Sequence, residues 1–134
     1  MKNQRSELSP KNKYWIPRFR YLELKNFCLQ YPDWKISLNS LDPLQAHSLK
    51  LATGKISDPT TNFSIYRMNI ENKISMVDTC ANLSEPSIAY WLIKGVTHNY
   101  SYEYLKYQLD LPAGRDYYYD RYRKFFWILD QKRK

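Results

Sequence analysis

The sequence predicts an all-α fold, in which a small helical domain carries an N-terminal helical arm, a long central amphipathic helix and a C-terminal helix-turn-helix. Three observations favour this class. Glycine occurs only three times in 134 residues. No stretch shows the turn-punctuated alternation of apolar and polar residues that is typical of sandwiches and barrels. Apolar residues instead recur at steps of three and four, and a hydrophobic content of 43% is too high for a disordered chain.

The N-terminal part of the chain divides into a tail and a helical arm. Residues 1–13 are charged and show no apolar period, which predicts a disordered basic tail. The N-terminal helical region covers residues 14–41, and its first helix is expected over 16–31, with Pro17 in the first turn. Pro32 should end or kink this helix, because proline breaks the hydrogen bonds of a helix interior, and a second short helix follows.

A linker and a long helix come next. Residues 42–59 contain proline and glycine among apolar residues that keep no period, which indicates a linker. The helical domain proper spans 60–134 and begins with an amphipathic helix over 60–82. We expect its apolar stripe to pack within its own domain, and the alternative is a homodimer through residues 63–81. The stripe has heptad spacing and consists of Phe63, Tyr66, Ile70, Ile74, Val77 and Ala81.

Two short helices are predicted after the long one. Ser84 precedes Pro86, a pattern typical of an N-cap with proline in the first helical turn. Residues 97–100 indicate the turn that follows this helix. Ser101 then caps a helix over 102–109. The buried residues of that helix should be Leu105 and Leu109.

The last helix is expected over 115–132, after Leu-Pro-Ala-Gly at 111–114. Residues 101–127 therefore have the outline of a DNA-reading helix-turn-helix, with a short helix, a turn and a longer basic and aromatic helix. One stripe of the last helix should face the core, namely Tyr118, Tyr122, Phe125 and Leu129. The residues expected to contact DNA are Ser101, Lys106, Arg115, Tyr117, Tyr119, Asp120, Arg121, Arg123 and Lys124.

The charge of the chain supports a polyanionic partner. The formal net charge is +8, and the excess lies at the two ends, with eight basic against three acidic residues in 1–35 and eight against five in 101–134. Basic side chains that neutralise phosphates release counterions, which favours binding of any nucleic acid. The alternative interpretation of this surplus is solubility alone.

The segment from Ser101 resembles the promoter-reading C-terminal domain of RNA polymerase sigma factors. That family typically runs Ser-Tyr-Glu-Glu-Ile-Ala, then Leu-Gly-Ile-Ser and a Gly-Thr-Val that opens the recognition helix. Here Ser101-Tyr102-Glu103, Leu109 and Gly114 match outright, and Leu105 and Leu111 match in kind. The overall layout is similar to phage-encoded transcription regulators with sigma-like C-termini, such as late-gene activators. The resemblance covers residues 84–129 and implies double-stranded DNA and RNA polymerase as partners.

Three residues depart from the sigma pattern. Lys106 stands where the family has a small residue, and lysine can extend its ammonium out to solvent. Asp110 replaces the glycine of the turn, and aspartate tolerates left-handed backbone angles. Asp116 occupies the position of a buried valine, so the pattern implies an inward-facing carboxylate unless the last helix is rotated.

The expected function is therefore a non-enzymatic, sequence-specific regulator of transcription from a phage or prophage. One alternative keeps the helix-turn-helix in a DNA-packaging recognition subunit, like a small terminase, that forms rings. A third is a phage inhibitor of a host protein or ribonucleoprotein, an anti-defence protein.

Enzymatic, cofactor and membrane classes are not expected. Tyr117, Tyr118 and Tyr119 lack the arginine and histidine cluster of a tyrosine nucleophile, and neither His47 nor His98 has a partner at metal-ligand spacing. No cofactor motif is present, and no apolar run approaches the ~20 residues that span a bilayer. Because the first ten residues lack the apolar core of a signal peptide, we expect a cytoplasmic protein with reduced thiols.

Overall fold

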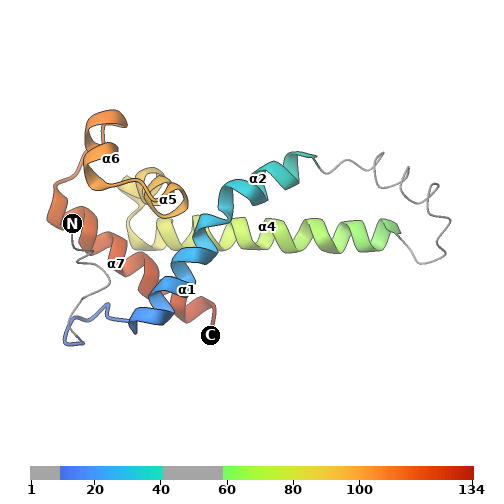
Figure 1. Cartoon of the computed structure of the whole chain (residues 1–134), viewed down its shortest axis with the longest axis horizontal. Coiled ribbons are helices and arrows are strands. Elements are labelled where there is room, and N and C mark those ends of the chain that lie inside the picture. The colour runs from blue at the N-terminus through green and yellow to red at the C-terminus, as the bar shows by residue number, and fades with distance from the viewer. Residues whose placement is uncertain (1–9, 41–58) are drawn as a thin grey trace.

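The computed structural model describes residues 10–40 and 59–134, with side chains described from residue 62 in the second range. Every regular element within these ranges is a helix, which confirms the all-α class (Figure 1). Most of the predicted basic tail and nearly all of the predicted linker at 42–59 lie outside the described residues. The helices are α1 (Arg18–Leu29), α2 (Tyr31–Ser40), α4 (Pro59–Ser84), the 3-10 helix η1 (Pro86–Ile88), α5 (Ala89–His98), α6 (Tyr102–Gln108) and α7 (Arg115–Lys132).

The long helix α4 forms the axis of the molecule. The helices α5, α6 and α7 gather at one end of it, and α2 runs alongside α4 toward the other end (Figure 1). Both α1 and α4 pack against α7, so the last helix lies in the middle of the fold. This placement makes α7 a structural helix along much of its length as well as a candidate for DNA contact.

The two proline-containing boundaries of the N-terminal arm differ slightly from expectation. Pro17 is the residue before α1 and not a member of its first turn, since its ψ of 146° is extended. Only Gln30 separates α1 from α2, and Pro32 lies in the first turn of α2. A missing N–H does no harm at that position, because first-turn amides have no partner within the helix. Pro32 thus ends the first helix as predicted, by beginning the next.

An ion pair joins α1 to α7. The Nε of Arg20 donates to Oδ1 of Asp130 at 2.7 Å, and Nη2 of the same guanidinium donates to the carbonyl of Arg133 at 3.1 Å. Asp130 is buried, and its carboxylate raises the pKa of Arg20 through this hydrogen bond. A buried carboxylate without such a partner would be strongly destabilising, so the pair fixes α1 against the end of α7.

The inward stripe of α7 is buried as predicted, and the core extends beyond it. Tyr118, Tyr122, Phe125 and Leu129 are each 5% exposed or less. Phe126, which the predicted stripe omitted, is buried as well. Its ring lies 5.1 Å from that of Tyr21, centroid to centroid, and packs edge-on. A helix that contacts α1 on one side and α4 on the other needs a wider apolar surface than one stripe supplies.

Helix α4 covers the predicted span, but its apolar stripe is buried only from Ile70 onward. Ile70, Ile74, Val77 and Ala81 lie in the core, which confirms packing within the domain for this part of the stripe. Tyr66, from the same stripe, is 52% exposed. Four of the six residues of the stripe therefore pack inside the chain.

Ser84 is not the N-cap that the sequence predicted. It is the last residue of α4, and its hydroxyl donates to the carbonyl of Arg121 at 2.6 Å. The cap of η1 is Glu85, whose carboxylate accepts from the amide of Ser87. The prediction was wrong because the partner of Ser84 lies on α7, far away in the sequence.

The two cysteines are free and buried, Cys28 on α1 and Cys80 on α4. Burial raises the pKa of both thiols, and that of Cys80 reaches about 11. Both side chains are therefore neutral at ordinary pH and serve as small apolar core residues.

Candidate nucleic-acid interface

The predicted Ser101 cap of α6 is present, and a tight turn follows this helix. The hydroxyl of Ser101 accepts from the amide of Tyr104 at 3.1 Å, which satisfies one of the free N–H groups at the start of α6. After α6, Asp110 adopts the left-handed conformation, with φ of 58°. The amide of Leu111 then bonds to the carbonyl of Leu105 at 3.0 Å and closes the turn. Asp110 is thus the left-handed residue of this turn.

Side chains hold the α6–α7 connection against its neighbours. The hydroxyl of Tyr102 donates to the carbonyl of Ala113 at 3.0 Å, across the turn. The indole N–H of Trp91, on α5, donates to the carbonyl of Leu109 at 2.7 Å. Both bonds satisfy carbonyls that no helix uses, so the turn is a fixed part of the structure rather than a loose loop.

Helices α5 and α7 approach closely at Gly95. A Cβ at this position would collide with the hydroxyl of Tyr118 and come within 3.3 Å of Cδ1 of Leu105. Glycine therefore allows the Tyr118 ring to enter between α5 and α6, where it is 1% exposed. The three helices α5, α6 and α7 form a small unit around this ring.

Asp116 is exposed, so the inward-facing carboxylate implied by the sigma pattern is not found. Tyr118, two residues further along α7, fills the inner position instead. The first turn of α7 therefore carries an acidic residue on its outer surface.

The structure places the nine predicted contact residues on the surface of α6 and α7, but few of them are open. Ser101 and Tyr117 are exposed. The other seven are half-buried: Lys106, Arg115, Tyr119, Asp120, Arg121, Arg123 and Lys124. Among the five basic side chains, Arg115 and Arg121 form ion pairs with neighbouring carboxylates.

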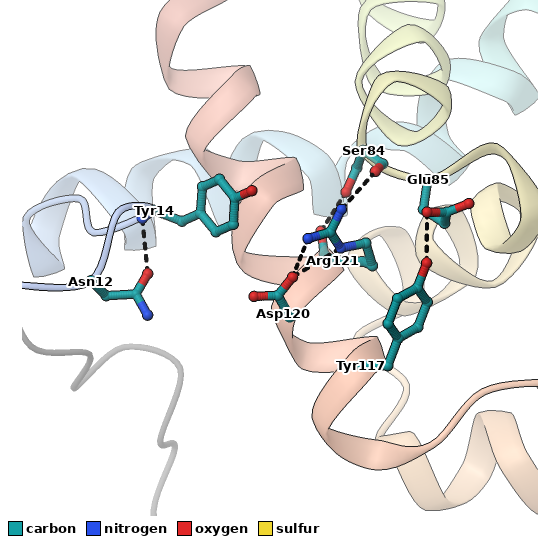
Figure 2. A network of polar contacts seen from close by, with 7 residues as sticks. All are labelled: Asn12, Tyr14, Ser84, Glu85, Tyr117, Asp120 and Arg121. Atoms are coloured by element: carbon teal, nitrogen blue, oxygen red, sulfur yellow. Dashed lines mark hydrogen bonds and ion pairs between the residues drawn. The ribbon is translucent and has the colours of Figure 1, made fainter.

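Arg121 is the clearest example of a held cation (Figure 2). Its side chain is 17% exposed, its Nε donates to Asp120 at 2.9 Å and its Nη1 reaches the carbonyl of Ser84 at 3.5 Å. The hydrogen bond with Asp120 raises the pKa of Arg121. The guanidinium thus ties α7 to the end of α4, which the sequence could not indicate.

Tyr117 joins α7 to the same junction through Glu85 (Figure 2). Its hydroxyl donates to Oε1 of Glu85 at 2.6 Å, which lowers the pKa of the carboxyl and raises that of the phenol. Both side chains are near solvent, so this contact can open without exposing the core.

Arg115 stands where α6 and α7 meet. It forms an ion pair with Glu103, and its guanidinium lies 5.7 Å from the ring centroid of Tyr102 and 5.4 Å from that of Tyr119. More than a third of the side chain remains exposed. Arg115 is thus the predicted contact residue that best combines a fixed position with access to a partner.

The N-terminal segment covers part of the outward side of α7. The ring of Tyr14 lies 6.0 Å from that of Trp127, and its amide bonds to the side chain of Asn12 at 2.8 Å. Figure 2 shows Tyr14 beside the part of α7 that carries Asp120 and Arg121. This contact could not be predicted, because the residues before Tyr14 have no apolar period.

Exposed tyrosines on α5 and α6 are a feature that the sequence interpretation missed. Tyr90, Tyr104 and Tyr107 are all exposed, and Tyr107 most of all, at 75%. The ring of Tyr100 lies 5.1 Å from that of His98 and 4.3 Å from that of Tyr104, so the three rings form a ladder. The signal was present in the sequence, because residues 104 and 107 lie on the side of α6 away from Leu105.

No known protein family, no curated protein and no solved structure matches this chain. In the part of the chain that the structure describes, no helix is both long and apolar enough to cross a membrane. Nor do these described residues contain a group of three or more histidine, cysteine, aspartate or glutamate side chains placed to hold a metal ion.

Proposed function

We propose that this protein binds double-stranded DNA and regulates transcription, in the manner of phage-encoded regulators, with α6 and the start of α7 docked on the duplex. The observation that carries the proposal is the capped helix, fixed left-handed turn and second helix formed by residues 101–132, with Arg115 at the junction. A short helix that crosses the phosphates and a second helix that enters the major groove is the docking geometry of such units.

The proposed contacts with DNA differ in kind, because some of the side chains are already bound to neighbouring residues and others are not. Lys106, Arg115 and Lys124 contact phosphates, and Ser101 and Tyr117 contribute hydrogen bonds at the edges. Arg115 leaves Glu103 on binding, because a half-exposed ion pair is worth at most about 1 kcal/mol while a guanidinium holds phosphate through two bonds. Arg121 and Asp120 keep α7 in place.

Further partners follow from the same proposal. A sigma-like unit implies contact with RNA polymerase, and many regulators of this kind read two half-sites as homodimers. Within residues 63–81 the apolar side chains left for such a dimer are chiefly Tyr66, Ile65 and Met68, all of them exposed. The dimer seam is therefore proposed at the first half of α4 alone.

The test is a salt titration of binding to duplexes selected from a random pool. In the double variant Arg115→Ala, Lys124→Ala, two phosphate contacts are lost, and the slope of log K against log salt should fall in magnitude by about 1.8. The matched control, Arg67→Ala with Lys73→Ala, removes the same charge from α4 and should keep the slope. An affinity that does not depend on salt, or equal slopes for the two variants, would refute the proposal.

A protein partner is the second candidate, and the acidic residues on this surface favour it. Glu103 already neutralises Arg115, one of the three cations proposed to contact phosphate, and Asp116 adds an exposed negative charge to the first turn of α7. The tyrosines at 104 and 107 would then contact a host protein, a ribonucleoprotein or, in a packaging ring, another copy. Tyr104→Ala with Tyr107→Ala should abolish such binding and leave DNA binding intact, and light scattering separates a ring from a dimer by mass.

A further inference from the structure

A cavity of about 650 Å³ lies between α2, α4 and α5, away from the residues proposed to contact DNA. Pockets for small organic ligands usually have volumes of about 300–1,000 Å³. This one is open to solvent on one side. Its walls come from three different helices that pack on one another, so its shape is part of the fold.

Two lysines stand on different walls of the cavity. Lys35 comes from α2 and Lys94 from α5. The ammonium of Lys35 lies 5.4 Å from the ring centroid of Tyr31, and that of Lys94 lies 5.7 Å from that of Tyr90. Neither lysine has a carboxylate within ion-pair distance among the described residues. The two cations are held by aromatic rings and retain their charge for a ligand.

The carboxylate that lines the cavity is already engaged. The hydroxyl of Tyr31 donates to Oδ1 of Asp78 at 2.8 Å. Burial and this hydrogen bond raise the pKa of Tyr31, which keeps the hydroxyl protonated. His98, also in the lining, has a lowered pKa through burial and through the charge of Lys94. With one carboxylate against two lysines, the lining carries a net positive charge.

The rest of the lining is largely apolar. Pro32 and Ile36 contribute from α2, and Ile93 contributes from α5. Ile36 is 64% exposed. An apolar ligand group placed here would remove this exposed isoleucine surface from water, which favours binding.

We propose that this cavity binds a small amphipathic organic anion, with its carboxylate or phosphate between Lys35 and Lys94 and its apolar body against Pro32, Ile36 and Ile93. The charge and the apolar wall of the cavity both favour this class of ligand. A neutral apolar compound would leave the two ammonium groups unused, and an inorganic anion would leave the apolar wall in water. The site is independent of the proposed DNA surface, so either proposal can fail alone.

The experiment is calorimetric titration of the whole chain with four probes: octanoate, octyl phosphate, octanol and inorganic phosphate. One or both of the organic anions should bind at one site per chain, and the difference between them shows whether the head group is a carboxylate or a phosphate. Octanol and inorganic phosphate should bind at least about tenfold more weakly, since each lacks one of two contacts worth at least ~1.4 kcal/mol. Equal binding of octanol, or no binding of any probe, would overturn the proposal.

Variants locate the site. Lys35→Ala with Lys94→Ala should weaken binding of the organic anion about tenfold or more, while the matched pair Lys73→Ala with Lys132→Ala should not change it. Ile36→Glu is a second test at an exposed position, where the fold tolerates a charge. It places a carboxylate at the mouth of the cavity and should abolish anion binding. Unchanged affinity in both cavity variants, with native circular dichroism, would exclude this site.

Discussion

The two ends of the molecule use apolar residues differently. At the end formed by α5, α6 and α7, the apolar faces of the helices largely meet another helix, and Leu92, Leu105 and Phe125 are completely buried. At the end formed by α2 and the first half of α4, Ile65 and Met68 are more than half exposed in the described part of the chain. The difference shows that an apolar position is buried only where a second helix reaches it.

The apolar stripe of helix α4 is exposed along one part of its length and buried along the other. The heptad spacing is as regular at Tyr66 as at Ile74, yet only Ile74 is buried. Periodicity therefore predicts which face of a helix is apolar, and the lengths of its neighbours decide how much of that face is covered.

The largest expected effect on stability is found when a buried position at one end is compared with an exposed position at the other. Phe125→Ala should lower the free energy of unfolding by about 3–5 kcal/mol, because a buried aromatic side chain leaves a cavity. Ile65→Ala should change it by no more than about 0.5 kcal/mol. Urea unfolding followed by circular dichroism measures both. Similar losses in the two variants would show that the first half of α4 is covered in solution.

The close contact of α5 and α7 gives the next effect. Gly95→Ala would normally stabilise a helix by up to about 1 kcal/mol, but here the new Cβ collides with the Tyr118 hydroxyl. We expect a net loss of about 1–3 kcal/mol, as is usual for overpacking. Tyr118→Phe removes the colliding oxygen and should recover part of this loss in the double variant. Stabilisation by Gly95→Ala alone would contradict this packing.

The cap of α6 should have a smaller effect. Ser101→Ala removes the acceptor for the amide of Tyr104 and should cost about 1 kcal/mol. Ser75→Ala, at an exposed position inside α4, is the matched control and should be neutral or slightly stabilising, since alanine is the better helix former. Thermal unfolding of the two variants distinguishes them, and equal stabilities would mean that the cap does not form.

The smallest effect is a pH dependence from His98. Its folded pKa lies below the ordinary value of 6.5, because burial and then Lys94 disfavour the charged ring. As the pH falls below 6.5, the unfolded chain therefore binds more protons than the folded chain. The stability that the neutral His98 ring contributes is complete above that pH and is lost on acidification. His98→Asn should flatten this part of the stability curve. His47 is present in both proteins, so the difference between the curves isolates His98.

Local patterns predicted the parts of the fold that depend on local chemistry. The Ser101 cap, the left-handed Asp110 and the span and inner stripe of α7 all follow from neighbours within a few residues. The partners of Ser84 and Arg121 lie more than thirty residues away, and the contact of Tyr14 with Trp127 spans most of the chain. Helical periodicity relates residues only a few positions apart. The partial burial of the candidate interface depends on contacts between distant parts of the sequence and therefore could not be predicted.

The ion pair between Arg20 and Asp130 has a consequence for biosynthesis. The two residues are 110 positions apart, and α1 leaves the ribosome long before α7 is made. Until α7 has been synthesised, Tyr21 and the part of α1 that packs on α7 lack this partner, although α5 is already present to cover another part of α1. This part of the core therefore closes only after α7 has been made, and until then the nascent protein exposes apolar surface that chaperones can recognise.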